Sequence, residues 1–236
     1  MPNWASLETE FTAQLQLKRP PVAVSFLEKA PEGVERFAGS SPAGCAFWRL
    51  AAEGRVFYTV ASDHYNCAIG SHTHSFPLPP ELAKGAEQTL GMMFQLEYVR
   101  PEEIPHIPQL KTTPAAVLYS PLGRTPVAPS VVLFFCSAAS AMLLHEAATH
   151  AGSGAAPPIL GRPTCMSLPA ALEKGTVASL GCIGNRVYTG LSDNELYFAV
   201  PGADLERVAR SLGVVSAANT ALSQYARGRL VQLSAS

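Results

Sequence analysis

Residues 131–144 read VVLFFCSAASAMLL and form the longest apolar run in the chain. The run is about 14 residues long and contains Ser137 and Ser140, whereas a helix needs roughly 20 predominantly apolar residues to cross a membrane. A membrane span is therefore not indicated. The run instead predicts a buried strand at Val131–Phe135 that leads into a buried helix at Ser137–His150.

Strands and helices follow one another around this run without a strict alternation. Further strands are predicted at Val22–Phe26, Val56–Ala61, Ala115–Tyr119, Val177–Leu180 and Leu196–Val200. Helices are predicted at Leu7–Leu17, Cys45–Ala52, Glu81–Leu96, Leu205–Leu212 and Ala217–Leu230. The 20 prolines and 18 glycines lie mostly between these elements. The pattern favours an α+β fold, in which residues 1–236 form a single loop-rich domain with a central mixed sheet flanked by helices.

The composition is that of a globular chain with few charges. The 236 residues weigh 25.0 kDa, and 47% of them are apolar while only 15% are charged, which excludes intrinsic disorder. The net charge of −1 leaves no basic surplus for binding nucleic acid. So few charges imply large apolar surfaces, and we therefore expect a homo-oligomer.

The first 20 residues, MPNWASLETEFTAQLQLKRP, lack the basic start and apolar core of a signal peptide. We therefore expect a cytoplasmic protein that does not associate with membranes. In that compartment the cysteines are reduced, so each of them is a core residue, a metal ligand or a nucleophile.

Two motifs resemble known catalytic or binding signatures and fall short of them. Residues 145–150 read HEAATH, but His145 and His150 are five residues apart and lie about 140° apart around a helix, so they do not share the face that a zinc protease requires. The stretch GCIGNRVYTG, residues 181–190, is predicted to be a loop and matches no phosphate-binding pattern. Its backbone amides and Arg186 offer a site for an anion. Alternatively, its glycines only supply tight turns.

The cysteines carry the clearest chemical signal. They are Cys45, Cys67, Cys136, Cys165 and Cys182, and none forms a CxxC pair. Cys136 lies within an apolar strand and is predicted to be a core residue. The other four lie beside turn residues, which is unusual for core cysteines, and their number matches the ligand set of a [4Fe–4S] cluster or a structural zinc ion.

Histidines add to this signal near Cys67. His64, His72 and His74 lie within a few residues of it, in a segment (62–80) that is predicted to be a loop. A thiolate and imidazoles in one loop are ligands that zinc and iron accept. The alternative is that the cysteines are small buried side chains and the histidines lie on the surface.

Several of these stretches together resemble the DUF169 family of uncharacterised bacterial and archaeal proteins. The resemblance is carried by PPVAVSF, HYNCAIGSHTH, GRPTC, SLGCIGNRVYTGL and ELYFAVPG, and it extends from about Leu15 to about Arg229. It implies a fold shared across the family, with the four turn-associated cysteines, Arg186 and Thr189 as part of its pattern. The histidines match less closely, and Cys136 is optional.

Two functions are open at this point. In the first, Cys45, Cys67, Cys165 and Cys182 bind a [4Fe–4S] cluster, with zinc as the alternative metal, and the protein transfers electrons to a redox partner or performs cluster-based chemistry on a small molecule. In the second, no metal is bound, and a small anionic ligand is held by the residues of the 181–190 segment, namely Gly181, Gly184, Asn185, Arg186 and Thr189. Whether the protein is an enzyme stays open. A purely structural role for the cysteines is the third reading.

Overall fold

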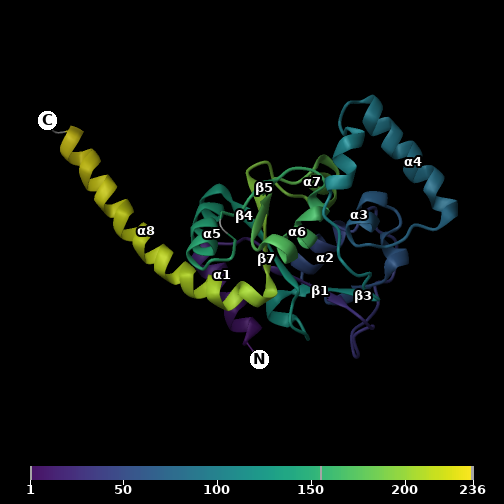
Figure 1. The fold of residues 1–236 in the computed structure, drawn as a ribbon. Helices are drawn as coiled ribbons and strands as arrows, with labels where there is room; N and C mark the ends of the chain where they lie inside the picture. The colour runs from purple at the N-terminus through teal and green to yellow at the C-terminus, as the bar shows by residue number, and fades with distance from the viewer. Residues whose placement is uncertain (1, 155, 235–236) are drawn as a thin grey trace.

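The computed structural model describes residues 2–154 and 156–234, and across them the chain folds around one seven-stranded mixed sheet (Figure 1). The strand order is β2-β3-β1-β4-β7-β6-β5. The strands are β1 (Val22–Leu27), β2 (Phe57–Thr59), β3 (Ala116–Pro121), β4 (Val131–Ser137), β5 (Ile159–Leu160), β6 (Val177–Ser179) and β7 (Glu195–Pro201). Neighbouring strands are antiparallel except β5 and β6, which are parallel. The predicted α+β fold with a central mixed sheet is confirmed.

Strand β4 lies in the middle of the sheet, paired with β1 and β7. Its side chains alternate between the two faces, and both faces are covered, so that nearly every position of the strand is buried. This explains why the sequence is continuously apolar there rather than alternating. The strand leads directly into helix α5 (Ala138–His150), as predicted, and the Ser137 hydroxyl caps that helix by accepting a hydrogen bond from the Ser140 amide.

One face of the sheet is covered by the helices α1 (Trp4–Leu15), α5 and α8 (Leu205–Ser234) (Figure 1). Phe11, Leu144 and Leu212 from these helices pack with Phe134 and Cys136 of β4 in one hydrophobic cluster. Cys136 is completely buried there, which confirms that it is a core residue.

The opposite face is covered by α2 (Ala46–Ala52) and α6 (Ser167–Lys174). Its core is rich in aromatic rings, including Phe47, Trp48, Tyr119 and Tyr197, which contact one another edge to face or obliquely. The helices α3 (Ala68–Thr73) and α7 (Ile183–Thr189) lie beside α2 and above this face (Figure 1). The cysteines other than Cys136 belong to this side of the molecule.

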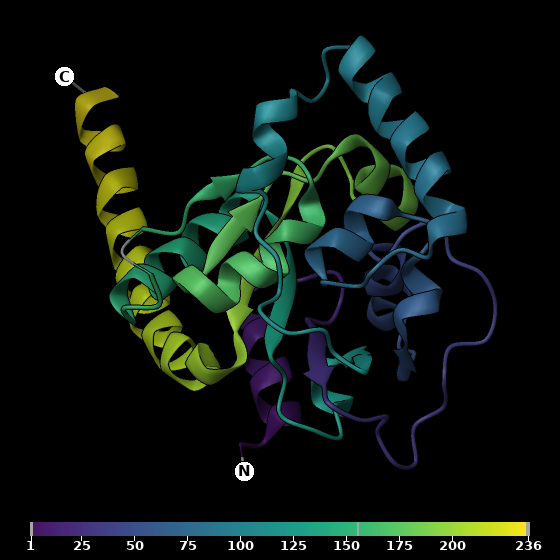
Figure 2. The ribbon, with the colours of Figure 1, turned by 45° about the vertical axis from the view of Figure 1, so that its right-hand side comes forward.

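Helix α4 (Pro80–Gln95) has no buried residue and lies at the edge of the structure, where it projects from the rest of the fold (Figure 2). Short 3₁₀ turns complete the described chain: η1 (Ala61–His64), η2 (Pro101–His106), η3 (Leu122–Arg124), η4 (Thr164–Met166) and η5 (Gly202–Asp204). No helix among the described residues has both the length and the apolar character needed to cross a membrane.

Three predicted segments differ in the structure, and the two-residue strand β5 was not predicted. The segments 62–80 and 181–190, predicted as loops, contain the short helices α3 and α7. Each has only six or seven residues, too few to display a helical period in the sequence. The two helices predicted at the C-terminus are a single helix of 30 residues, because Gly213 lies in it without interrupting the hydrogen bonding.

Candidate functional site

Four cysteines lie at the starts of short helices. Cys45, Cys67 and Cys182 are the N-cap residues of α2, α3 and α7, and Cys165 lies in the turn η4 that leads into α6. The first amides of a helix have no partner within it, and they carry the positive end of its dipole. The three N-cap sulfurs make no capping hydrogen bond, however, and burial outweighs any effect of the dipole on Cys45 and Cys67.

The structure brings these four thiols, from segments far apart in the chain, into one cluster. Burial is the main cause that raises the pKa of Cys45, to about 12, and the charges of Cys67 and Cys182 raise it further. The pKa of Cys165 is well above its ordinary value because of burial, and the charges of Cys67, Cys45 and Cys182 add to the effect. Cys67 and Cys182 interact in the same way. All six pairs among the four thiols are thus close enough to repel when charged. We refer to these four residues as the thiol cluster.

Cys136 lies outside the thiol cluster. Burial raises its pKa too, but the neighbouring charge is that of Glu195 and not of another cysteine. It belongs to the core on the other face of the sheet. The distinction between four clustered cysteines and one core cysteine is therefore a feature of the fold.

The thiol cluster is not arranged around a single ion. Within residues 2–154 and 156–234, no group of three or more His, Cys, Asp or Glu side chains stands where it could hold a metal ion. The thiols of this protein are close enough to interact but do not converge on one point.

Helix α3 links two of the clustered cysteines. The backbone amides of Gly70 and Ile69 lie near the Cys67 sulfur and lower the pKa of this thiol, although burial dominates and raises it. The Cys165 Sγ lies 3.9 Å from the Ile69 carbonyl oxygen, to which it donates. A Cβ added to Gly70 would lie 3.4 Å from the Cys67 Sγ, so a larger residue there would crowd the sulfur.

Cys165 and Cys182 are linked as well. The Cys182 amide donates a hydrogen bond to the hydroxyl of Thr164, the residue before Cys165. Both cysteines thus share one hydrogen-bonded junction between η4 and α7, although they are 17 positions apart in the sequence.

The side-chain amide of Asn185 lies beside the thiol cluster and lacks hydrogen bonds of ordinary geometry. Its side chain is 1% exposed and lies close enough to the Cys45 thiol and the Tyr197 hydroxyl to lower the pKa of both groups. Neither its amide nitrogen nor its amide oxygen, however, makes a hydrogen bond of ordinary geometry. A buried amide without good partners is costly, and the Cys45 thiol and the Tyr197 hydroxyl are the nearby groups that it affects.

The other residues predicted for the 181–190 segment mostly support the chain itself. Arg186 donates to the backbone carbonyl oxygens of Ser192, Leu180 and Glu195 at 2.9, 2.8 and 3.1 Å. The Thr189 hydroxyl accepts from the Tyr197 hydroxyl at 2.8 Å and donates to the Asn185 carbonyl oxygen. These bonds hold α7 in place and leave little of either side chain for an anionic ligand.

Two of the three glycines of this segment, Gly181 and Gly184, were predicted to bind a ligand, and they have different roles. Gly181 has φ +79°, and a Cβ on it would lie 3.1 Å from the Asn185 Oδ1, so a glycine is required at this position. Gly184 lies inside α7, where a Cβ would meet only the Tyr188 ring at 3.5 Å. Gly181 therefore allows the close approach of Asn185 to the turn before α7.

His64 and His74 form a buried pair next to the thiol cluster rather than part of a ligand set. Their rings are 5.2 Å apart, and they pack with Phe47 and Phe76. The His64 Nε2 and the Thr59 Oγ1 are 2.8 Å apart, and the His74 Nδ1 lies 2.8 Å from the Gly70 carbonyl oxygen. Burial lowers the pKa of both rings, that of His74 to about 4, so both are neutral at pH 7.

The remaining histidine of the segment, His72, is only partly buried, and burial lowers its pKa as well. The sequence did not reveal the packing role of His64 and His74, although one signal was present. A Cβ on Gly44 would lie 2.8 Å from the His64 Nδ1, so the glycine before Cys45 makes room for this ring.

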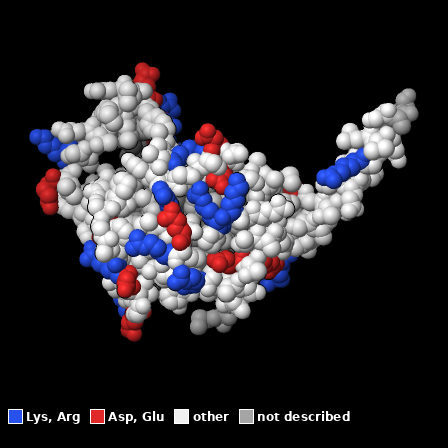
Figure 3. Space-filling model, turned by 180° about the vertical axis from the view of Figure 1, so that it is seen from behind, with Lys and Arg blue, Asp and Glu red and all other residues white. Residues whose placement is uncertain are grey.

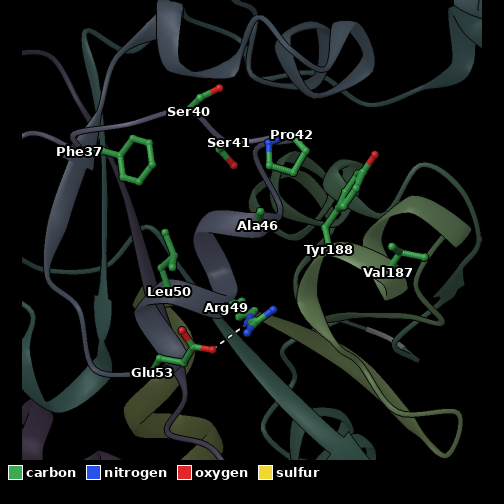
Figure 4. A pocket seen from close by; sticks show the side chains of 10 residues that line it. All are labelled: Phe37, Ser40, Ser41, Pro42, Ala46, Arg49, Leu50, Glu53, Val187 and Tyr188. Carbon is green, nitrogen blue, oxygen red and sulfur yellow. Dashed lines mark hydrogen bonds and ion pairs between the residues drawn. The ribbon is translucent and has the colours of Figure 1, made fainter.

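An open cavity of about 400 Å³ lies between α2 and α7, and none of the clustered cysteines lines it (Figure 4). Its wall includes Ala46, Leu50 and Tyr188, and the Arg49 guanidinium at its edge pairs with the Glu53 carboxylate at 2.7 Å. Because that cation is already paired, the cavity offers no free charge to a ligand. The helices on its two sides are those that begin at Cys45 and Cys182.

Comparison with known proteins places these residues in a family. The DUF169 family, described as uncharacterised ArCR, matches residues 10–211 of the chain. The chain is also 27% identical over 207 residues to the uncharacterized protein MJ0308 of Methanocaldococcus jannaschii, and the match covers 84% of this chain and 88% of that protein. No solved structure matches the chain. All four residues of the thiol cluster lie within the span of the family match.

Proposed function

The chain belongs to the DUF169 family, and within it we propose that this protein binds a [4Fe–4S] cluster through Cys45, Cys67, Cys165 and Cys182. The single observation that carries the proposal is the proximity of these four thiols, all six pairs of which lie close enough to interact electrostatically. Four cysteines from four separate segments, gathered in one buried region, supply the ligand set of such a cluster.

The surroundings of the thiol cluster suit an anionic iron–sulfur group. Three of the sulfurs belong to N-cap residues, and the nearby amides of Gly70 and Ile69 lower the pKa of the Cys67 thiol. Hydrogen bonds to sulfur and burial are the means by which a protein tunes such a group. The Asn185 amide supplies a further donor next to Cys45.

Zinc is the alternative metal for the same four cysteines. A zinc ion needs all four sulfurs at about 2.3 Å from one point, whereas a cubane cluster holds its cysteine ligands at separate corners. Among the described residues no group of three or more His, Cys, Asp or Glu side chains is placed to hold a metal ion, so the assays of metal content below decide between the two. With four protein ligands the site is closed, which suits electron transfer or sensing.

The alternative of an anionic ligand held by the 181–190 segment receives less support. Arg186 would have to carry the attraction, and its guanidinium already donates to three backbone carbonyl oxygens. Binding an anion there would require those bonds to be replaced.

Anaerobic purification followed by a visible spectrum and assays for iron and sulfide tests the proposal. We expect a brown protein with about four irons and four sulfides per chain. Cys182→Ser should abolish the colour, whereas the matched control Cys136→Ala should keep the full iron content, because Cys136 lies on the other face of the sheet. A colourless protein after anaerobic reconstitution, a protein with one zinc, or equal effects of the two substitutions would overturn the proposal.

A further inference from the structure

Polar groups that lack a hydrogen-bond partner occur in the interior of this protein. On the face of the surface seen in Figure 3, by contrast, basic and acidic side chains are interspersed among uncharged ones, and that face shows no large patch of a single sign. One of the interior groups is the hydroxyl of Tyr119 on β3. This residue is 0% exposed, and its hydroxyl makes no hydrogen bond of ordinary geometry within the part of the chain that the structure describes.

The ring of Tyr119 is held by aromatic neighbours. It stacks on Phe57 of β2, with ring centroids 5.6 Å apart, and contacts Phe47 of α2 at 5.5 Å. Both neighbours are buried as well. The ring therefore has no route by which its hydroxyl reaches solvent, and the hydroxyl stays in the interior without a partner.

The Tyr119 hydroxyl lies next to the thiol cluster. Tyr119 and Cys45 belong to one packed group of buried residues, and Phe47, which touches the ring, follows Cys45 by two residues in α2. Burial is the main cause that raises the pKa of the Tyr119 phenol, and the charges of Cys45 and Cys165 raise it further. Two of the clustered sulfurs are therefore near this hydroxyl.

The side-chain amide of Asn185 on α7 is a second group in the same situation. It is 1% exposed, and neither of its polar atoms has a hydrogen bond of ordinary geometry. Its Oδ1 lies toward Gly181, and the amide lowers the pKa of the Cys45 thiol, as only its donating nitrogen can. Two buried donors from different elements, β3 and α7, thus lie beside Cys45 without a partner.

We propose that Tyr119 and Asn185 donate hydrogen bonds to the sulfur of Cys45 when this residue is bound to metal, and that they thereby position and stabilise the metal-bound thiolate. This inference rests on the proposed metal centre. A thiol is a weak acceptor, whereas a thiolate accepts charge-assisted hydrogen bonds, which are about twice as strong as neutral ones. Both donors therefore acquire an acceptor when metal binding removes the proton of Cys45.

A buried water molecule shared by the two groups is the alternative explanation. Such a water would satisfy Tyr119 in the metal-free and in the metal-bound protein alike. The two explanations differ in the metal-free protein, where our proposal leaves the hydroxyl unpaired and the water would pair it.

The variant Tyr119→Phe separates the two explanations. In the metal-free protein its urea midpoint should equal or exceed that of the wild type, because the substitution removes an unpaired buried hydroxyl and keeps the ring. In the metal-bound protein a chelator should remove the metal about tenfold faster, since one charge-assisted hydrogen bond is lost. The reduction potential of the cluster should shift to more negative values, because a donor to a ligating sulfur favours the reduced state.

The matched control is Tyr197→Phe. Tyr197 is also completely buried and near Cys45, but its hydroxyl already donates to the Thr189 hydroxyl at 2.8 Å. This variant should have a lower urea midpoint in the metal-free protein, with the chelation rate and the potential of the wild type. Asn185→Asp replaces the amide donor by a carboxylate of the same size, and it should lose metal faster than the wild type.

The outcomes separate this inference from the metal centre on which it rests. A Tyr119→Phe variant with a lower urea midpoint in the metal-free protein, or with an unchanged chelation rate and potential, would overturn the inference while the metal centre stands. A wild type that binds no metal would overturn both. If the metal is zinc, the proposed cluster is wrong, and the chelation rates of Tyr119→Phe and Tyr197→Phe still decide the inference.

Discussion

Acid should destabilise the metal-free protein through the buried histidine pair. His74 is 1% exposed, and burial lowers its pKa from 6.5 to about 4. In the unfolded state the ring becomes protonated below pH 6.5, whereas in the folded state it stays neutral until the pH approaches 4. The free energy of unfolding is therefore highest above pH 6.5 and decreases as the pH falls towards 4. The full difference corresponds to about 3.4 kcal/mol, of which about 2 kcal/mol is lost between pH 7.5 and pH 5.

The loss comes from the burial of the ring and not from its hydrogen bond. The Gly70 carbonyl oxygen, 2.8 Å from the His74 Nδ1, favours the charged ring, but burial outweighs it. His64, whose pKa is also lowered mainly by burial, adds a loss of the same sign. Protonation therefore acts on a helix that holds one of the clustered thiols.

Urea unfolding at the two pH values measures the effect. The wild type should lose at least about 2 kcal/mol between pH 7.5 and pH 5, and the variant His74→Gln should lose about 2 kcal/mol less over the same range. The exposed His106 provides the control, since His106→Gln should leave the pH dependence as in the wild type. An unfolding free energy that does not change with pH, or a His74→Gln variant with the wild-type pH dependence, would refute the reasoning.

Three other outcomes are expected. Burial raises the pKa of Cys45 from 9.0 to about 12, so this thiol should contribute about 1.4 kcal/mol to the stability that the metal-free protein loses between pH 8 and pH 10 in urea unfolding, and Cys45→Ala should reduce the loss by that amount. Arg186→Ala should lower the free energy of unfolding by about 2 kcal/mol, because three carbonyl oxygens lose their donor, while the iron content stays unchanged; the reverse result would favour the anion site. Gly202→Ala should cost about 3 kcal/mol or more, since the added Cβ would lie 1.7 Å from the Pro129 carbonyl oxygen; a thermal scan showing an unchanged Tm would contradict this.

Much of the fold could be predicted from local pattern. The run at 131–135 predicts a strand because only a segment buried on both faces tolerates five consecutive apolar residues, and β4 is such a segment. The same reasoning, from periodicity and apolar content, predicts helix α5 and the strands β1, β3 and β7. The short helices α3 and α7 could not be predicted, because six or seven residues in a glycine- and histidine-containing stretch show no period, and packing against the body decides their conformation.

The sequence by itself distinguished the one cysteine that belongs to the core from the four that lie elsewhere. Cys136 lies in an apolar strand, whereas the other four lie beside turn residues, and this contrast is visible in the order of residues along the chain. Only the tertiary structure decided that those four thiols are neighbours and that Arg186 is occupied by three carbonyl oxygens. The physical reason is that both facts depend on contacts between segments far apart in the chain, which arise when α2, α3, α6 and α7 pack together and which no local pattern of residues encodes.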